Sequence, residues 1–276
     1  MGETRSLASS TLARMLDRTE WPVVHAENDA ELLAYVGTRS GLESYRAGNI
    51  SWVITGVPSS DYNGVIWARL SDEEAELQVP LLVDRFRMQQ VPAVWHLDAS
   101  TQPVDLGDRL QALGCQPLAA ATRMAAPIVS VTRGLRTLPD LRIERATSTD
   151  ELALWMDLWT EMRQEPRAPR EELYRALGLN RFEPLRHYLV RLGGRPVGVS
   201  QLFLGQRGAG VHNVTVREEY HGLGLGSALV QHPLLEARTL GYDLAVITPS
   251  PSQVAPFEAL GFEIVPPAAL DYQLWP

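Results

Sequence analysis

The stretch REEYHGLGLGSALV (217–230) contains three glycines at alternate positions, Gly222, Gly224 and Gly226. They lie just before residues that we expect to form a helix. Glycine is unfavourable inside a helix but lets the backbone come close to a ligand. The first N–H groups of a helix lack partners within it, and with the positive end of the helix dipole they attract phosphate. Alternating glycines remove side chains that would block phosphate oxygens. The spacing therefore predicts a phosphate or pyrophosphate site, with a purely structural glycine turn as the alternative.

Two familiar kinds of phosphate-binding turn fit these glycines poorly. A P-loop needs a lysine after its glycines, and all 25 basic residues of this chain are arginine. The dinucleotide-binding pattern G-x-G-x-x-G is met by Gly222 and Gly224, but Ser227 stands where the third glycine belongs. Only residues 228–276 follow, which is too short for the rest of a doubly wound sheet. The glycine turn therefore indicates an anion-binding fold of another kind.

The composition narrows the class of protein. With 276 residues, 45% hydrophobic and 21% charged, the chain is typical of a soluble globular protein of one large domain or two ordinary ones. The net charge of −8 argues against nucleic acid as a partner. The missing lysine excludes Schiff-base chemistry. The single cysteine, Cys115, excludes an internal disulfide and a multi-cysteine metal site, and we expect it to be a small buried core residue.

No apolar run is long enough for a membrane span, and the N-terminus lacks the apolar core of a signal peptide. We therefore expect a cytoplasmic protein without membrane partners. The bias toward Arg, Ala and Pro indicates a GC-rich bacterial genome.

The elements of the first half follow from periodicity and turn residues. We expect helices at 3–18, 28–40, 79–90 and 105–113, and strands at 51–57, 64–70 and 92–98. Residues 132–140 form a polar link with Gly and Pro, where we place a domain boundary.

The second half reads as a mixed α/β domain with one glycine-rich turn between strand and helix. Ser148 with Glu151 forms a capping-box pattern at the start of a helix. We expect strands at 141–146 and 209–216, a helix at 169–178, a hairpin around Gly193-Gly194, a helix to about Leu240, the strand DLAVIT, a short helix, and closing strands FEIV and DYQLW.

The two halves resemble each other. ALGC (112–115) and ALGF (259–262) lie 147 positions apart, 259 minus 112. The same shift places VIWARL (65–70) on HNVTVR (212–217), and SDEEAELQV (71–79) on the glycine turn. This indicates an internal duplication whose first copy carries acidic residues where the second carries glycines. The first copy should therefore repel an anion at this position.

The residues around the glycines resemble the signature of the GNAT acetyltransferase superfamily. Its pyrophosphate loop, Arg/Gln-x-x-Gly-x-Gly/Ala, lies between a strand ending in V-x-V and a helix, and here VTV (214–216) precedes Gly224 and Gly226 at the two glycine positions. Its second hallmark, a short helix ending near Tyr-x-x-Leu-Gly-Phe, is similar to FEALGF (257–262). With the repeat, the resemblance is to tandem GNAT proteins with a degenerate N-terminal copy.

The resemblance implies an α/β fold of two GNAT-like domains in tandem, each a mixed, mostly antiparallel sheet flanked by helices. Residues 1–131, including the N-terminal helix, form the degenerate copy, 132–140 the linker, and 141–276 the acetyltransferase domain.

The resemblance further implies acetyl-CoA, or a related acyl-CoA, as donor, and no metal. Its pyrophosphate is expected on the backbone of the loop, and its pantetheine arm along the strand before it. These cofactor-binding positions are Val214, Thr215, Val216, His221, Gly222, Leu223, Gly224, Leu225, Gly226, Ser227, Ser250 and Phe257. Three of them depart from the family pattern: His221 replaces Arg or Gln, Ser250 replaces Asn, and Phe257 replaces the Tyr that often protonates the leaving thiolate.

Three residues are candidates for the catalytic chemistry. Acetylation of an amine needs a general base or a water chain near the site of transfer. His212 lies on the strand where many relatives carry Glu or His, and its ordinary pKa near 6.5 suits a base. The alternative is a histidine that is simply packed or exposed. Asn213 orients a substrate or a water, or is a structural hydrogen-bonder. Glu161, with Glu165, lies in the segment that commonly lines the acceptor pocket, or is a solvated loop charge.

The function expected from the resemblance is an N-acyltransferase (EC 2.3.1 type) that moves acetyl from acetyl-CoA directly to a small-molecule amine. We expect a monomer or a homodimer. Two alternatives stay open: a non-catalytic CoA-binding protein, and an acyl or aminoacyl transferase whose donor is bound to a carrier protein or tRNA.

Overall fold

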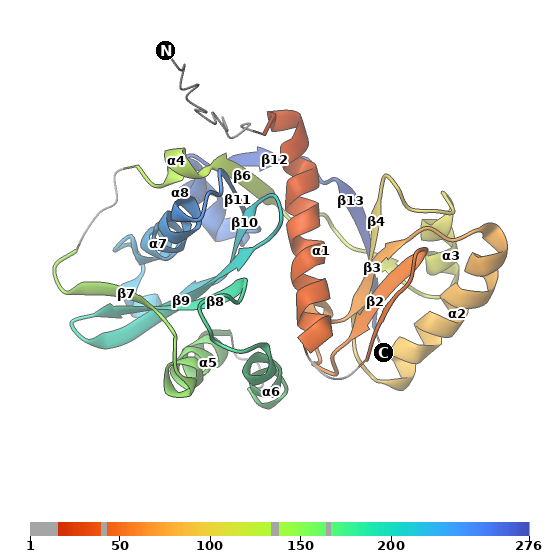
Figure 1. Ribbon diagram of the computed structural model, residues 1–276, viewed down its shortest axis with the longest axis horizontal. Coiled ribbons are helices and arrows are strands. Elements are labelled where there is room, and N and C mark those ends of the chain that lie inside the picture. Colours follow the sequence, from red (N-terminus) through yellow and green to blue (C-terminus); the bar gives the residue numbers. More distant parts are fainter. Residues whose placement is uncertain (1–15, 40–42, 134–137, 164–166, 276) are drawn as a thin grey trace, which may run out of the picture.

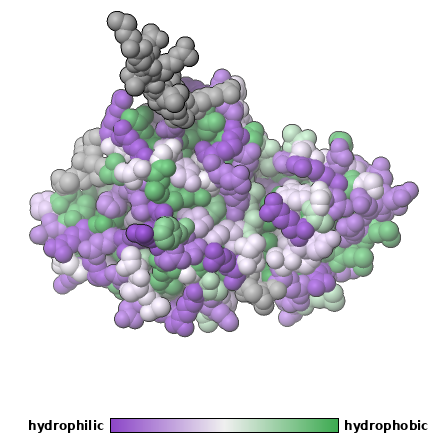
Figure 2. All heavy atoms as spheres, in the orientation of Figure 1, coloured by the Kyte–Doolittle hydropathy of each residue, from purple (hydrophilic) through white to green (hydrophobic). Residues whose placement is uncertain are grey.

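Two β-sheets lie on either side of one long helix, α1 (Trp21–Arg39), in the computed structural model of the chain (Figure 1). The structure describes residues 16–39, 43–133, 138–163 and 167–275. Most of the helix predicted at 3–18 lies outside the described residues. Within these ranges, no helix is long and apolar enough to cross a membrane. Figure 2 shows hydrophilic side chains over most of both lobes, with apolar ones scattered among them.

In the part of the chain that the structure describes, the first sheet has six strands in the order β1-β2-β3-β4-β13-β5. Its strands are β1 (Glu43–Arg46), β2 (Ile50–Ile54), β3 (Gly64–Ala68), β4 (Ala93–Asp98), β5 (Gln116–Pro117) and β13 (Ala269–Leu274). Helices α2 (Asp72–Met88) and α3 (Leu106–Ala112) pack on this sheet. Phe86 of α2 and Leu110 of α3 are fully buried with Trp95 of β4 in one hydrophobic core. Cys115 lies in the same core, as expected, and burial raises the pKa of its thiol to about 11.

The second sheet, within the described ranges, has seven strands in the order β12-β6-β11-β10-β9-β8-β7. Its strands are β6 (Arg123–Pro127), β7 (Leu141–Arg145), β8 (Leu185–Leu192), β9 (Arg195–Leu204), β10 (Ala209–Val216), β11 (Leu244–Ile247) and β12 (Glu263–Val265). Its helices are α4 (Ile128–Val131), α5 (Thr149–Arg163), α6 (Ala168–Leu177), α7 (Leu225–Thr239) and α8 (Val254–Ala259). Successive strand residues point to opposite faces: Leu189 packs with α5, whereas Tyr188 packs with α7. Helices α1, α5 and α6 therefore cover one face, and α7 covers the other.

Among the described residues, each sheet contains one parallel pair of strands among antiparallel neighbours. In the first sheet β3 runs parallel to β4, and in the second β10 runs parallel to β11. All other neighbouring strands are antiparallel. The predicted fold class, two mixed and mostly antiparallel sheets flanked by helices, is confirmed.

The two sheets exchange strands across the predicted domain boundary. Strand β6 precedes the linker at 132–140, of which 134–137 lie outside the described residues, yet it pairs between β11 and β12 of the second sheet. Strand β13, expected to close the second domain, pairs instead between β4 and β5 of the first sheet (Figure 1). An alternating sequence pattern identifies a strand but not the sheet edge that it joins. The sheets therefore do not divide at the linker.

The first copy has a helix where the second has its glycine turn. We expected a helix from residue 79, but α2 begins at Asp72 because Ser71 and Glu74 form a capping box, with the N–H of Glu74 3.2 Å from Ser71 Oγ. Its first turn carries Asp72, Glu73 and Glu74. These three carboxylates at the helix N-terminus disfavour the binding of an anionic ligand there.

Candidate active site

The glycine turn leaves an open helix N-terminus. Gly222 and Gly224 have φ of 80° and 78°, a conformation that side-chain-bearing residues adopt only with strain, and α7 starts immediately after them. A Cβ at either position would meet nothing within 4 Å, so the space in front of the turn is open. The first helical hydrogen bond runs from the N–H of Ala228 to the carbonyl of Gly224. The N–H groups of Leu225, Gly226 and Ser227 therefore point out of the helix toward this space.

The side chain of His221 links this turn to the end of β10 through a hydrogen bond. Its Nε2 lies 2.8 Å from the carbonyl oxygen of Val216, to which the ring donates when Nε2 carries the proton. The ring is exposed, and the hydrogen bond spans the 3₁₀ helix at Glu218–Tyr220. His221 therefore shapes the turn, where the family pattern has a cationic or amide side chain.

Strands β10 and β11 separate directly beside this turn. Their parallel pairing ends at Val211 opposite Ile247, although β10 continues to Val216. Asn213 has φ of 53°, and the pairing of β10 with β9 shifts between His212 and Thr215. The bulge bends β10 away from β11 and exposes backbone polar groups in the gap. We call the gap that opens beyond Val211 and Ile247 the splay.

A glutamine that the sequence did not indicate bridges the splay. The Nε2 of Gln253 donates to the carbonyl of Val214 at 3.1 Å, and its Oε1 accepts from the hydroxyl of Ser250 at 2.9 Å. The side chain of Ser250 is therefore linked to β10 through that of Gln253, which it helps to hold in place. Val214 and Val216 are two of the positions expected along the pantetheine arm, and the carbonyl of each lies within hydrogen-bond distance of a side chain, that of Gln253 or His221.

His212 lies at the start of the splay, on the face covered by α1. Its Nε2 is buried and has no hydrogen-bond partner among the described residues, and the same holds for Oδ1 of Asn28 on α1. Helix and strand approach so closely here that a Cβ on Gly210 would lie 2.5 Å from His212 Nε2 and 2.0 Å from Asn28 Oδ1. Burial lowers the pKa of His212, against the opposing effect of the carboxylate of Asp29. The ring is therefore neutral at pH 7.

A histidine–aspartate pair on α1 reaches the splay from the first half of the chain. His25, 1% exposed, has Nδ1 3.2 Å from Asp29 Oδ2 and Nε2 3.1 Å from the carbonyl oxygen of Ile247, the last residue of β11. Burial raises the pKa of Asp29, but His25, His212 and Arg123 together hold it below its usual value. Sequence reasoning missed this pair because it began the helix at residue 28. The i, i+4 spacing of His25 and Asp29 was the available signal.

Comparison with known proteins decides the family of this site. Residues 152–262 match the model of the Acetyltransferase (GNAT) family. Residues 152–262 form a GNAT domain. A search of curated proteins gave no significant match.

The whole fold is similar to solved structures that contain this domain. A GCN5-related N-acetyltransferase from Kribbella flavida is 15% identical, with 90% of this chain and 95% of that chain covered and a TM-score of 0.62. A tandem GNAT protein from the clavulanic acid biosynthesis pathway is 13% identical, with 92% and 95% covered and a TM-score of 0.59. At such low sequence identities the similarity is one of fold. The fold of this chain comprises two GNAT-like units.

Asn213 is held in place within the GNAT domain. Its Oδ1 accepts from the indole N–H of Trp159 at 3.2 Å, and its Nδ2 donates to Oε1 of Gln201 at 2.5 Å. Trp159 is 2% exposed and stacks on Trp155 of the same helix with 6.2 Å between ring centroids. The amide of Asn213 therefore stabilises the bulge in β10, which agrees with the structural alternative considered for it.

Two further candidates from the sequence, Glu161 and Phe257, offer no free acid or base at the splay. Glu161 forms an ion pair with Arg217 at 2.6 Å and is more than half exposed, which matches its reading as a solvated charge. Glu165 lies outside the described residues. Phe257 is 2% exposed and packs 6.1 Å from Phe262 in the core beneath α7. It has no proton to give to a thiolate.

Proposed function

We propose that this protein is an N-acyltransferase that moves acetyl from acetyl-CoA directly to the amine of a small molecule. One observation carries the proposal: an open helix N-terminus, a splay between two parallel strands, and a buried histidine nitrogen without a partner adjoin one another in the GNAT domain. An anion site, a slot for a thioester and a base are the parts that such a transfer needs.

The turn fits the pyrophosphate of the donor. The N–H groups of Leu225, Gly226 and Ser227 supply directed donors, and the glycines leave room in front of them. This use of the main chain accounts for an anion site in a chain without lysine. The first copy has acidic residues at the corresponding helix start, so we expect one donor molecule per chain.

His212 is the base in this proposal. The amine nitrogen attacks the thioester carbonyl carbon, and His212 Nε2 accepts the proton that the nitrogen loses. The C–S bond then breaks, the amide forms, and the thiolate of CoA leaves and takes a proton from water or from the imidazolium. A thiolate is a good leaving group, so Phe257 in place of the family tyrosine is compatible with turnover. A backbone N–H in the splay would stabilise the oxyanion, an effect worth a few kcal/mol in comparable sites.

The experiment is a thiol-release assay with acetyl-CoA and a panel of amines. Cys115 is 0% exposed with its pKa raised to about 11, so the protein itself contributes little signal with a thiol reagent. Amine-dependent release of CoA supports the proposal. Binding of acetyl-CoA without turnover on any amine supports the non-catalytic alternative, and absence of binding supports a donor carried by a protein or tRNA.

A further inference from the structure

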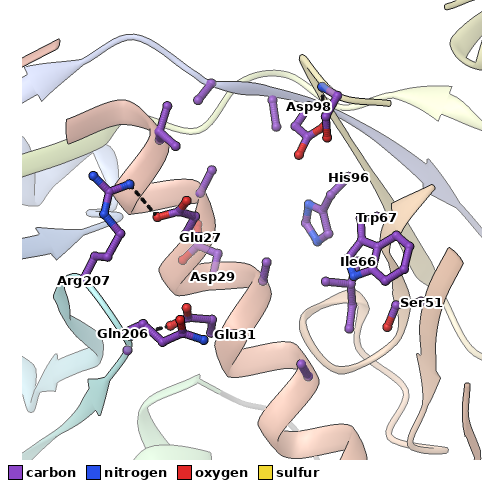
Figure 3. A pocket seen from close by; sticks show the side chains of 18 of the residues that line it. Glu27, Asp29, Glu31, Ser51, Ile66, Trp67, His96, Asp98, Gln206 and Arg207 are labelled. Atoms are coloured by element: carbon purple, nitrogen blue, oxygen red, sulfur yellow. Dashed lines mark hydrogen bonds and ion pairs between the residues drawn. The ribbon is translucent and has the colours of Figure 1, made fainter. Parts of the chain in front are cut away.

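A cleft of about 970 Å³ lies between α1 and the first sheet, and it extends to the turn between β9 and β10 (Figure 3). Figure 3 shows α1 along its floor, Gln206 and Arg207 on one side, and His96, Trp67 and Ile66 of the first sheet on the other. Both halves of the chain therefore build this cleft.

The inner end of the cleft borders the splay of the GNAT domain. Asp29 lines the cleft, and its partner His25 bonds the carbonyl of Ile247 where β11 leaves β10. Arg123 also lines the cleft and precedes Met124, whose register partner is Ile247. A molecule in the cleft therefore lies next to the position proposed for the acyl group.

The α1 side of the cleft is acidic. The pKa of Asp29 lies below its usual value, so its carboxylate is charged at pH 7, and 30% of its side chain is exposed. Glu31 accepts the backbone N–H of Gln206 at 2.8 Å, and burial raises its pKa. Glu27 is paired with Arg207 at 3.1 Å. Asp29 is therefore the carboxylate best placed to attract an ammonium group beside the splay.

The opposite side of the cleft carries arginines without counter-ions. Arg46 and Arg69 line the cleft and form no ion pair among the described residues; Asp98 lies on the same side, and its Oδ1 accepts from the hydroxyl of Ser100 at 2.7 Å. Arg69 is oriented: its Nη2 donates to Ser100 Oγ at 3.0 Å, and its guanidinium lies 5.6 Å from the ring centroid of Trp67. An oriented guanidinium without a carboxylate partner is suited to bind an anionic group.

From this arrangement we propose that the cleft binds the acceptor, and that the acceptor is an amine that also bears a carboxylate, of the amino-acid type. Its ammonium lies at Asp29 and gives one proton to solvent to become the attacking amine, its carboxylate lies at Arg46 and Arg69, and its apolar part lies over Trp67. This inference rests on the proposed function and specifies its substrate class. It also gives the degenerate first half a role, since that half supplies both charged walls.

The test compares free amino acids with their amides and with the matching carboxyl-free amines in the thiol-release assay. We expect kcat/KM to be at least about tenfold higher for the free amino acids, since one charge-assisted hydrogen bond accounts for such a factor. The double variant Arg46→Ala/Arg69→Ala should lose this preference. Arg195→Ala, an exposed arginine at the start of β9, is the matched control and should keep the preference.

The outcomes separate the inference from the proposed function. Equal or faster turnover of carboxyl-free amines, or a double variant that keeps the preference, overturns the inference while the acyltransferase function stands. If no amine is acetylated, the same amino acids are titrated into the protein by calorimetry. Binding that requires Arg46 and Arg69 then supports the cleft although the transfer proposal fails, and absence of binding overturns both.

Discussion

Arg123 Nη2 lies 3.0 Å from Asp271 Oδ2, and this ion pair joins the two strands that the halves of the chain exchange. Arg123 starts β6 in the second sheet, and Asp271 lies in β13 of the first sheet. The other carboxylate oxygen of Asp271 is 2.8 Å from His96 Nδ1. Burial raises the pKa of Asp271, but His96 and Arg123 outweigh it and hold the pKa below its usual value. The two sheets are therefore connected by this ion pair as well as by the exchanged strands.

Asp271→Asn should destabilise the protein by about 3 kcal/mol, because it leaves a largely buried arginine without its counter-ion. Arg123 has a side chain only 8% exposed. Chemical unfolding measures the change. Glu263→Gln is the control, since it breaks an ion pair with Arg18 whose side chains are 45% and 71% exposed, and it should cost less than about 1 kcal/mol. Equal losses in both variants would contradict a special role for the Arg123–Asp271 pair.

Strand exchange predicts that residues 141–276 do not fold alone. Without β6, strands β11 and β12 lose the neighbour that they share, which leaves unpaired edges in the second sheet. We expect this fragment to aggregate, and to become soluble when it is produced together with residues 1–140. Size-exclusion chromatography makes the comparison with the intact chain. A soluble, cooperatively unfolding monomer of 141–276 would show that the exchange is dispensable.

His212→Gln should lower kcat by a factor of about 100 and change the dissociation constant for acetyl-CoA little, because it removes a base but not the anion site. Since burial lowers the pKa of His212, the wild-type rate should fall only as the pH drops below the ordinary histidine value of 6.5. His232→Gln, at a part-buried histidine on α7, serves as control and should retain activity. An unchanged kcat in His212→Gln would exclude it as the base.

His187 should make the fold acid-sensitive. It is 1% exposed between Trp155 and Tyr174, and burial lowers its pKa from 6.5 to about 3. Below pH 6.5 the unfolded chain binds a proton that the folded chain does not, so stability falls by up to roughly 1.4 kcal/mol per pH unit from this group. His187→Leu should remove this part of the slope between pH 6.5 and 4, as measured by unfolding at each pH. An identical slope in both proteins would refute the assignment.

Much of this architecture was predictable from local sequence signals. The Ser148–Glu151 capping box forms, with the N–H of Glu151 3.2 Å from Ser148 Oγ, and α6 spans Ala168–Leu177 against a prediction of 169–178. The open turn at Gly222 and Gly224 was also predicted, because it depends on backbone freedom within a few residues. Such features are decided by short-range interactions.

Features that depend on distant contacts were not predictable in this way. The pairing of β13 with β4 joins residues far apart in the chain, and no local pattern selects that edge. The approach of His25 and Asp29 to β11 depends on how α1 crosses the second sheet. Likewise, Gln253 gains its role only because η4 (Pro251–Gln253) lies opposite Val214.

The central claim, that the turn before α7 holds the donor, is tested most directly by calorimetric titration with acetyl-CoA of wild type, Gly224→Glu and Gly194→Glu. Gly194 is the matched control, because its φ of 80° is close to the 78° of Gly224 and its surroundings are equally open, but it lies in the β8–β9 turn. We predict one molecule per chain, binding abolished by Gly224→Glu and retained by Gly194→Glu. Two molecules per chain, undiminished binding by Gly224→Glu, or no binding by wild type would contradict the account.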